Sequence, residues 1–193
     1  MSLGIAPALA GMAAAALLLL PRPAALVLER ADLGSAYTGR GSAVDNADAA
    51  RGAPAGFAAR LARWRRVGGY EITFTRRVRP GGLQDGPLAV QSSVSVYRGE
   101  RGARASFAYA GKHLVPAGYV PLALGFAVGD EARQWVRQGE SGFGTLLQYL
   151  LMWREANVDA SLVLTGRVGV VSAADVAPLA RRQEARIRAA TRH

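Results

Sequence analysis

The sequence contains no cysteine. This excludes a disulfide scaffold, a cysteine nucleophile, a thiolate-bound zinc or iron–sulfur site, and a lipid anchor attached through cysteine. Histidine is almost as scarce: there are two, His113 and the final printed residue His193, so a metal centre built from several histidines is not expected. We therefore predict no metal or other cofactor for this chain.

Lysine is also nearly absent, because Lys112 is the only lysine among 24 basic residues in a chain with a formal net charge of +10. The arginines are scattered from Arg22 to Arg192 and accompany a high alanine content. Arginines selected for phosphate recognition would instead cluster along a groove or a helix face. We interpret the excess as compositional and do not expect a nucleic-acid partner. An arginine-rich cytoplasmic nucleic-acid-binding protein is the first alternative.

Charge is missing from the amino terminus as well. No charged side chain occurs from Met1 to Pro21, and Met12 to Leu20 is continuously apolar. As a helix, Leu3 to Leu20 would reach about 27 Å, just short of a hydrocarbon core of about 30 Å. We predict that residues 1–28 are a signal peptide or a membrane anchor, with Pro23 to Ala25 as a loose cleavage candidate. A buried core helix is the alternative.

This segment sets the predicted location of the protein. We expect it to be periplasmic, on the cell surface or secreted, and a membrane surface is a conceivable contact if residues 3–20 remain as an anchor. Arg22 and Arg30 follow the segment and would favour a cytoplasmic carboxyl side if the segment were retained. We therefore favour a cleaved signal peptide over a retained membrane anchor.

Residues 29–193 predict a single α+β domain, with 29–53 as a partly irregular lead-in. Its pattern indicates an antiparallel sheet of about five to six strands with helices packed on it, in the order α-β-β-α-β-β-β-α. The expected helices lie near residues 57–66, 103–110 and 176–190, and the expected strands near 70–78, 88–98, 132–138, 145–154 and 158–164. The last helix has the clearest signal, since Ser172 and Asp175 resemble a capping box.

The expected order of helices and strands resembles the PsbP-like sandwich family, and several short fragments are similar to those in small, uncharacterised exported bacterial domains. These fragments are Gly69-Tyr70, Gly129-Asp130-Glu131, Trp153 to Asn157 and Arg182 to Ile187. Together with the element order, they extend the resemblance over about residues 30 to 190. The resemblance implies a non-catalytic accessory or ligand-sensing domain outside the cytoplasm. It carries over no functional residue, and the lipid-modified cysteine that many such domains have is missing here.

The segment from Gly111 to Gly125 is irregular and contains Pro116 and Pro121. Long broken loops carry function more often than cores do. We expect a pocket for a small ligand or a protein partner to open between this loop and the sheet. Its predicted lining residues are Tyr119, Phe126, Trp135 and Arg137.

Catalytic patterns are weak throughout the sequence. Ser141 misses a Gly-x-Ser-x-Gly elbow by one position, and His113 is the only histidine inside the domain. We expect Asp130 to bond turn backbone and Glu131 to pair with an arginine. The three tryptophans Trp64, Trp135 and Trp153 read as core residues. We therefore predict a non-enzymatic protein. A hydrolase with an unrecognised site remains the second alternative, and Asp130 and His113 are the residues whose mutation would test it.

Overall fold

The structure is a computed structural model that describes residues 20–77, 86–142 and 144–191. The predicted export segment, residues 3–20, lies outside these ranges except for Leu20. No helix within the described ranges is both long and apolar enough to cross a membrane. Leu26, Val27 and Leu28 are buried in the core, at 1 %, 3 % and 1 % exposure, so the packed domain already includes the end of the range 1–28.

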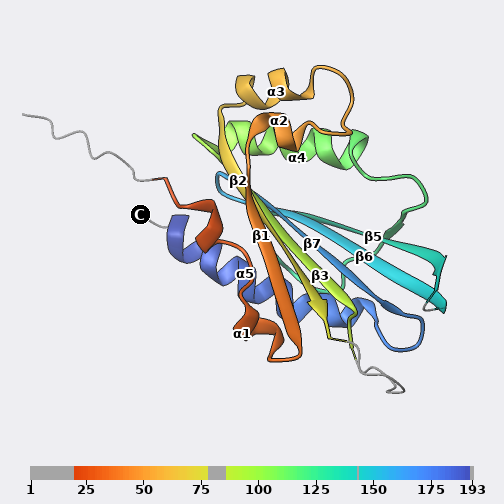
Figure 1. Cartoon of the computed structure of the whole chain (residues 1–193). Coiled ribbons are helices and arrows are strands. Elements are labelled where there is room, and N and C mark those ends of the chain that lie inside the picture. The colour runs from red at the N-terminus through yellow and green to blue at the C-terminus, as the bar shows by residue number, and fades with distance from the viewer. Residues whose placement is uncertain (1–19, 78–85, 143, 192–193) are drawn as a thin grey trace, which may run out of the picture.

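One antiparallel sheet forms the centre of the molecule (Figure 1). Its strand order is β1-β2-β3-β7-β6-β5-β4, and every neighbouring pair runs antiparallel. The strands are β1 (Tyr37–Val44), β2 (Arg66–Arg76), β3 (Ala89–Tyr97), β4 (Val120–Leu122), β5 (Glu131–Ser141), β6 (Gly144–Glu155) and β7 (Val158–Arg167). The predicted α+β class with an antiparallel sheet is confirmed, and the sheet has seven strands where about five to six were expected.

The helices divide between the two faces of this sheet. Helix α5 (Val176–Thr191) crosses one face, after the short turn η2 (Ala173–Asp175), and η1 (Pro23–Ala25) and α1 (Arg30–Leu33) lie beside it (Figure 1). At the end where β1 stops and β2 begins, α2 (Asn46–Ala49), α3 (Phe57–Arg63) and α4 (Glu100–His113) lie together. Helix α4 contacts β3, β7 and β6, so it covers only one end of the second face.

The main core lies between α5 and the sheet. Alternate residues of β3 and β7 point into it, because successive side chains of a strand face opposite sides. These residues are Val90, Val94 and Val96 of β3 and Val158, Ala160, Leu162 and Leu164 of β7, all buried. The predicted stripe of α5, Val176, Leu179, Ala180, Gln183 and Ile187, is also buried. The predicted capping box is confirmed, since Asp175 accepts from the Ser172 backbone N–H at 2.7 Å.

A second, smaller apolar layer lies under α3 and α4. Phe57 and Leu61 of α3 are buried at 5 % and 2 % exposure, and Phe107 of α4 at 2 %. The Phe57 ring stacks on Tyr109 with 5.4 Å between ring centroids. The predicted docked helix is confirmed, although it ends at Arg63 and the chain already enters β2 at Arg66.

Two strands were wrongly read as irregular chain. The predicted partly irregular lead-in, residues 29–53, is small and polar from Gly39 onward, yet Tyr37–Val44 is the edge strand β1. Its glycines are needed there: a Cβ on Gly39 would come within 2.7 Å of the Phe74 ring, and one on Gly41 within 2.7 Å of Tyr70. Within the predicted broken loop, Val120–Leu122 pairs with β5 as the short edge strand β4.

Candidate functional site

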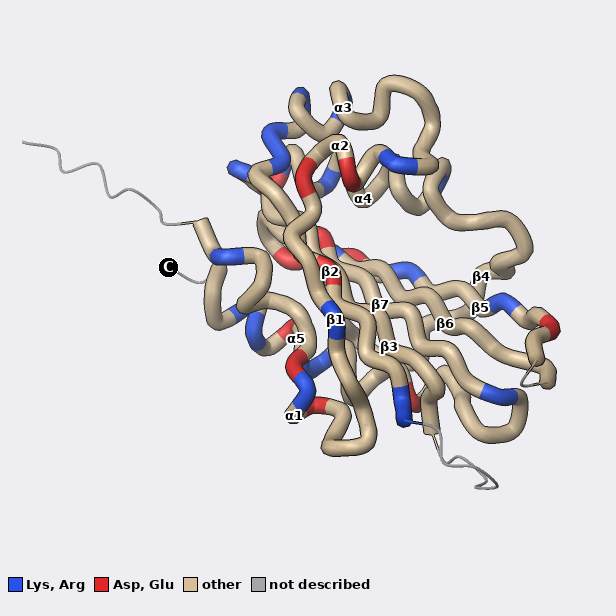
Figure 2. The backbone as a smooth tube through the Cα atoms, viewed as in Figure 1, with Lys and Arg blue, Asp and Glu red and all other residues tan. Residues whose placement is uncertain are grey.

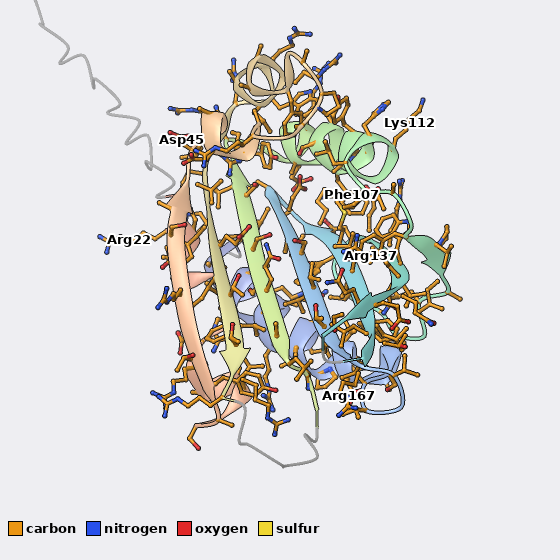
Figure 3. All side chains as sticks on the ribbon, turned by 45° about the vertical axis from the view of Figure 1, so that its right-hand side comes forward. Arg22, Asp45, Phe107, Lys112, Arg137 and Arg167 are labelled. Atoms are coloured by element: carbon orange, nitrogen blue, oxygen red, sulfur yellow. The ribbon has the colours of Figure 1, made fainter. Side chains whose placement is uncertain are left out.

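The sheet face opposite α5 carries mainly polar side chains, and we call it the polar face. One row across it consists of Ser42, Glu71, Ser93, Ser161, Met152 and Arg133. The next row consists of Arg40, Thr73, Gln91, Val163, Leu150 and Trp135. Because α4 covers only one end of this face, the polar face has a covered end and an open end. Figure 3 places Phe107 between α4 and the sheet at the covered end.

A cavity of about 210 Å³ lies at the covered end, between α3, α4 and the sheet. Its polar lining comes from Arg66, Ser93, Ser95, Tyr97, Ser106, Asp159 and Ser161. Apolar surface from the α3 and α4 layer and from Met152 completes the walls. A few polar groups converging on a concave, partly apolar space is the usual form of a small-molecule site.

Asp159 is the most perturbed group in this cavity. Burial raises the pKa of its carboxyl from 3.8 to about 8, against the opposing effects of hydrogen bonding to Ser106 and Tyr97 and of the Arg154 charge. Its Oδ1 atom is buried and has no hydrogen-bond partner among the described residues. Because a buried unpaired acceptor is costly, Asp159 favours either a bound proton or an occupant that donates a hydrogen bond.

Tyr97 and Ser106 extend this polar group from the sheet to α4. The Tyr97 hydroxyl donates to Ser106 Oγ at 2.6 Å. Burial, with Asp159 as the second cause, raises the pKa of Tyr97 well above its ordinary value. Beside them, the hydroxyls of Ser93 and Ser161 lie 2.7 Å apart across β3 and β7. The cavity therefore presents groups that can both donate and accept hydrogen bonds.

Arg66 closes the cavity at the start of β2. Its guanidinium donates from Nε to Ser95 Oγ at 3.0 Å and from Nη1 to the Val44 carbonyl at 3.0 Å and Asn46 Oδ1 at 3.1 Å. Burial lowers the pKa of Arg66, and the nearby Tyr97, Asp45 and Asp159 oppose this shift. Its bonds join β1, β2 and β3, so Arg66 fixes the wall of the cavity rather than leaving a free charge in it.

The open end of the polar face holds three of the four residues predicted to form a pocket. The Arg137 guanidinium lies over the Tyr119 ring, 4.9 Å from its centroid. The Tyr119 hydroxyl and Arg137 Nε both donate to Gln148 Oε1, at 3.2 Å and 3.0 Å. Trp135 faces the same side of β5 two residues earlier and is buried at 8 % exposure. Figure 3 shows Arg137 on this side, below α4.

Phe126 lies in the other layer. Its ring packs against the core around α5, and the Arg181 guanidinium of α5 lies 6.0 Å from its centroid. The structure therefore brings Tyr119, Trp135 and Arg137 to one face and places Phe126 behind the sheet. Whether any of the four binds a ligand stays a prediction.

Sequence reasoning did not single out Asp159, Tyr97, Ser106 or Arg66 as site residues. The one available signal was the strand period: the buried alternation of Val158, Ala160 and Leu162 places Asp159 on the opposite face. That α4 would cover this position depends on contacts between residues more than fifty positions apart, which no local pattern reveals.

The groups considered for hydrolysis have other partners. Asp130 Oδ2 accepts from Arg154 Nη1 at 2.7 Å and from the Ala156 backbone N–H at 3.0 Å, and Glu131 pairs with Arg154 at 3.2 Å. The predicted turn and ion-pair roles of these carboxylates are thereby confirmed. His113 is exposed at the end of α4, with its ring 4.5 Å from that of Tyr109. In the described ranges, no cluster of three His, Asp or Glu side chains is suited to hold a metal ion.

Comparison with solved structures finds a protein of similar fold. No family model matches the chain, and no curated protein matches it. The fold is similar to the crystal structure of the extracellular domain of PknH from Mycobacterium tuberculosis, with a TM-score of 0.55 and 12 % sequence identity. The alignment covers 89 % of this chain and 96 % of that one. At this identity the likeness shows a shared α+β fold, and the PsbP-like resemblance stays a prediction.

Proposed function

We propose that this chain is a non-enzymatic ligand-binding module that works outside the cytoplasm, with its ligand held between α4 and the polar face. The observation that carries the proposal is the cavity of about 210 Å³ lined by Asp159, whose buried Oδ1 has no hydrogen-bond partner among the described residues. The likeness to an extracellular domain supports the proposed location, as does the apolar amino-terminal segment. A sensor role is the finer form of this proposal.

The cavity chemistry favours a small polar molecule that is not strongly charged. Asp159 and the Ser93 and Ser161 hydroxyls can exchange hydrogen bonds with hydroxyl or amide groups of a ligand. Met152 and the α3 and α4 side chains would cover its apolar part. A strongly charged ligand would lose hydration between α4 and the polar face without a free counter-charge to replace it.

The proposal is tested by filling the cavity. Ala110 of α4 lines it and is buried at 8 % exposure, whereas Ala108 on the same helix is exposed. A thermal-shift screen of the full chain against small sugars, polyols and amides should yield compounds that stabilise the protein. Ala110→Leu should abolish that stabilisation and Ala108→Leu should preserve it. Equal responses in both variants would place any ligand elsewhere.

The location is tested separately. Mass spectrometry of the protein recovered from fractionated native cells should find it outside the cytoplasm, either beginning near Leu26 or still containing Leu17–Leu20. A start at Leu26 would keep the buried Leu26, Val27 and Leu28 in the domain. Recovery of the intact chain dissolved in the cytoplasm would contradict the proposed location.

A further inference from the structure

A group of arginines at the α3 end of the molecule has no counter-charge. We call Arg63, Arg65, Arg98 and Arg101 the arginine groove; all four are exposed. Within the described residues, none of the four has a carboxylate within 4 Å, whereas Arg51, Arg104, Arg154, Arg186 and Arg188 each form an ion pair. Figure 2 shows basic positions gathered along α3 and at the entry to β2. The arginine groove is thus concentrated positive charge that the fold leaves unpaired.

The surface is hollowed at this point. Two adjoining depressions of about 590 and 600 Å³ share Arg65 and Arg98 in their walls. No acidic residue lines either depression, and the side of Trp64 forms part of one wall. The nearby carboxylates of α2 are engaged elsewhere, because Asp48 pairs with Arg51 and Asp45 accepts from the Asp48 backbone N–H at 2.7 Å.

Arg65 occupies a backbone conformation that its residue type disfavours. Its φ is +58°, in the left-handed region where glycine is the usual residue. Two backbone hydrogen bonds hold it there, from Arg65 N–H to the Ala62 carbonyl at 2.9 Å and from Arg98 N–H to the Arg65 carbonyl at 3.0 Å. Strained non-glycine residues concentrate at functional sites. An arginine where glycine would be more stable indicates that its side chain serves a purpose other than folding.

The hydrogen bond from the Arg98 N–H to the Arg65 carbonyl also aligns the two halves of the arginine groove. It joins the end of α3 to the segment that leads into α4, and Gly102 of α4 approaches so closely that a Cβ there would lie 2.1 Å from the Trp64 carbonyl oxygen. Arg63 and Arg65 on one side and Arg98 and Arg101 on the other are therefore held by fixed backbone. The first turn of α4 adds a modest positive potential, although Glu100 in that turn offsets part of it.

We propose that the arginine groove binds a phosphate group, carried either by an anionic lipid headgroup or by a soluble phosphate compound. Guanidinium groups form paired, charge-assisted hydrogen bonds with phosphate oxygens, and several of them on a rigid frame can surround one such group. The groove carries four exposed arginines and no acidic residue in its walls, unlike the cavity beside Asp159, so it constitutes a second site, which shares only Arg66 with the cavity.

The test uses the full chain in two arms. In the first, vesicles of phosphatidylcholine with phosphatidylglycerol are compared with vesicles of phosphatidylcholine alone in a flotation assay. In the second, inorganic pyrophosphate is titrated into the protein in a non-ionic detergent. The apolar residues 3–20 carry no charged side chain, so their contribution is the same for both vesicle types. Binding in the vesicle arm alone assigns the lipid source, and binding of pyrophosphate assigns a soluble one.

The double variant Arg63→Ser/Arg101→Ser should weaken binding at least about tenfold in whichever arm is positive. The matched control Arg22→Ser/Arg167→Ser removes the same charge from exposed positions away from α3, as Figure 3 shows, and should stay within about twofold. Equal losses in the two double variants would mean that only net charge matters, and would overturn the proposal. Binding of duplex DNA with no response to vesicles or pyrophosphate would overturn it too.

Arg65 allows a sharper readout. Arg65→Gly should weaken phosphate binding while raising the melting temperature by about 2–4 °C, because the left-handed strain is relieved. Ala156→Gly is the matched control: Ala156 has φ +50° in the turn between β6 and β7, so this change should raise the melting temperature similarly and leave binding unchanged. If Arg65→Gly bound phosphate as well as the parent chain, the inferred purpose of the strained arginine would be wrong.

Discussion

The two faces of the sheet are made by the same strands but have opposite chemistry. In β7, Val158, Ala160, Leu162 and Leu164 face α5 and are fully buried, while Asp159, Ser161, Val163 and Thr165 face the other way and are only partly buried. The α5 face is closed along its length by one long helix, whereas the polar face is covered at one end by α4 (Figure 1). Stability is thus concentrated on one face, which leaves the other free to carry polar groups that packing alone would not favour.

The difference between the two faces is tested most directly by substituting two adjacent residues of β7. Leu162→Ala should reduce the free energy of unfolding by about 2–5 kcal/mol, because Leu162 is 1 % exposed and its loss leaves a cavity against α5. Val163→Ala, on the polar face, should reduce it by less than about 1 kcal/mol. Urea denaturation followed by circular dichroism measures both. Equal losses would mean that the two faces contribute alike to stability.

The next-largest expected effect concerns two linked hydrogen bonds buried between the sheet and α5. Ser92 Oγ accepts from the Leu28 backbone N–H at 3.0 Å and donates to Gln183 Oε1 at 2.9 Å, and all three residues are buried. Ser92→Ala leaves two buried groups unpaired and should reduce the free energy of unfolding by about 1–3 kcal/mol. Ser172→Ala, at an exposed helix cap, provides a control in which urea denaturation should show a smaller loss of about 1 kcal/mol.

If Ser92→Ala lowered the free energy of unfolding by less than Ser172→Ala did, the hydrogen bonds through Ser92 would not link the amino-terminal segment to α5. The additional variant Gln183→Leu separates the two bonds, because it removes the acceptor from α5 and leaves the bond between Leu28 and Ser92 in place.

On the polar face, Asp159 should make the stability of the protein depend on pH. Its folded pKa is about 8 and its ordinary value is 3.8, so the unfolded chain releases this proton first as the pH rises. The folded state therefore loses relative stability between about pH 4 and pH 8, and no further loss from this group occurs above that range. Asp159→Asn removes this dependence, so its melting temperature should exceed that of the parent chain increasingly from pH 4 to pH 8.

The groups around Asp159 define what else can shift that curve. Arg66 of β2, Tyr97 of β3, Arg154 of β6 and Glu131 of β5 all interact with it. Asp159→Asn leaves these four groups in place, so the difference between the two melting curves reports Asp159 itself. Parallel curves from pH 4 to pH 8 would mean that the carboxyl is not buried as the structure places it.

The α5 face of the sheet could be predicted from the sequence, because the residue patterns that mark it are local. The period-two pattern of β3 and β7 and the helical stripe from Val176 to Ile187 each follow from a single segment. Strand β1 was missed for a physical reason: as an edge strand it buries little, and its glycines are required by rings of the neighbouring strand, Phe74 and Tyr70. The residues of β1 therefore show no local alternation of apolar side chains that would mark it as a strand.

The candidate sites were harder to predict, because they depend on which helix covers which row of the sheet. The strand pattern shows only that Asp159 faces away from Val158 and Ala160, and the cover that α4 provides over it depends on tertiary structure. The scatter of arginines along the sequence concealed the arginine groove, since Arg63 and Arg65 meet Arg98 and Arg101 only after β2 and β3 pair. The contact between Tyr119 and Arg137 could be anticipated, because the loop that contains Tyr119 and the strand β5 are close in sequence, and a ligand-binding role for either residue stays a prediction.

The smallest expected effect is local and lies at the open end of the polar face. Burial raises the pKa of Tyr119 and the Arg137 charge opposes that shift. Arg137→Gln should therefore raise the pKa of Tyr119 further, while changing the free energy of unfolding by less than about 1 kcal/mol. Absorbance titration of the tyrosinates, with Tyr119→Phe to identify the Tyr119 signal, measures the shift. Arg133→Gln lies on the same strand and face but over Phe107, so it should leave Tyr119 unchanged. If both variants moved the Tyr119 titration equally, the general charge of the polar face would control it, and the contact between Tyr119 and Arg137 would not.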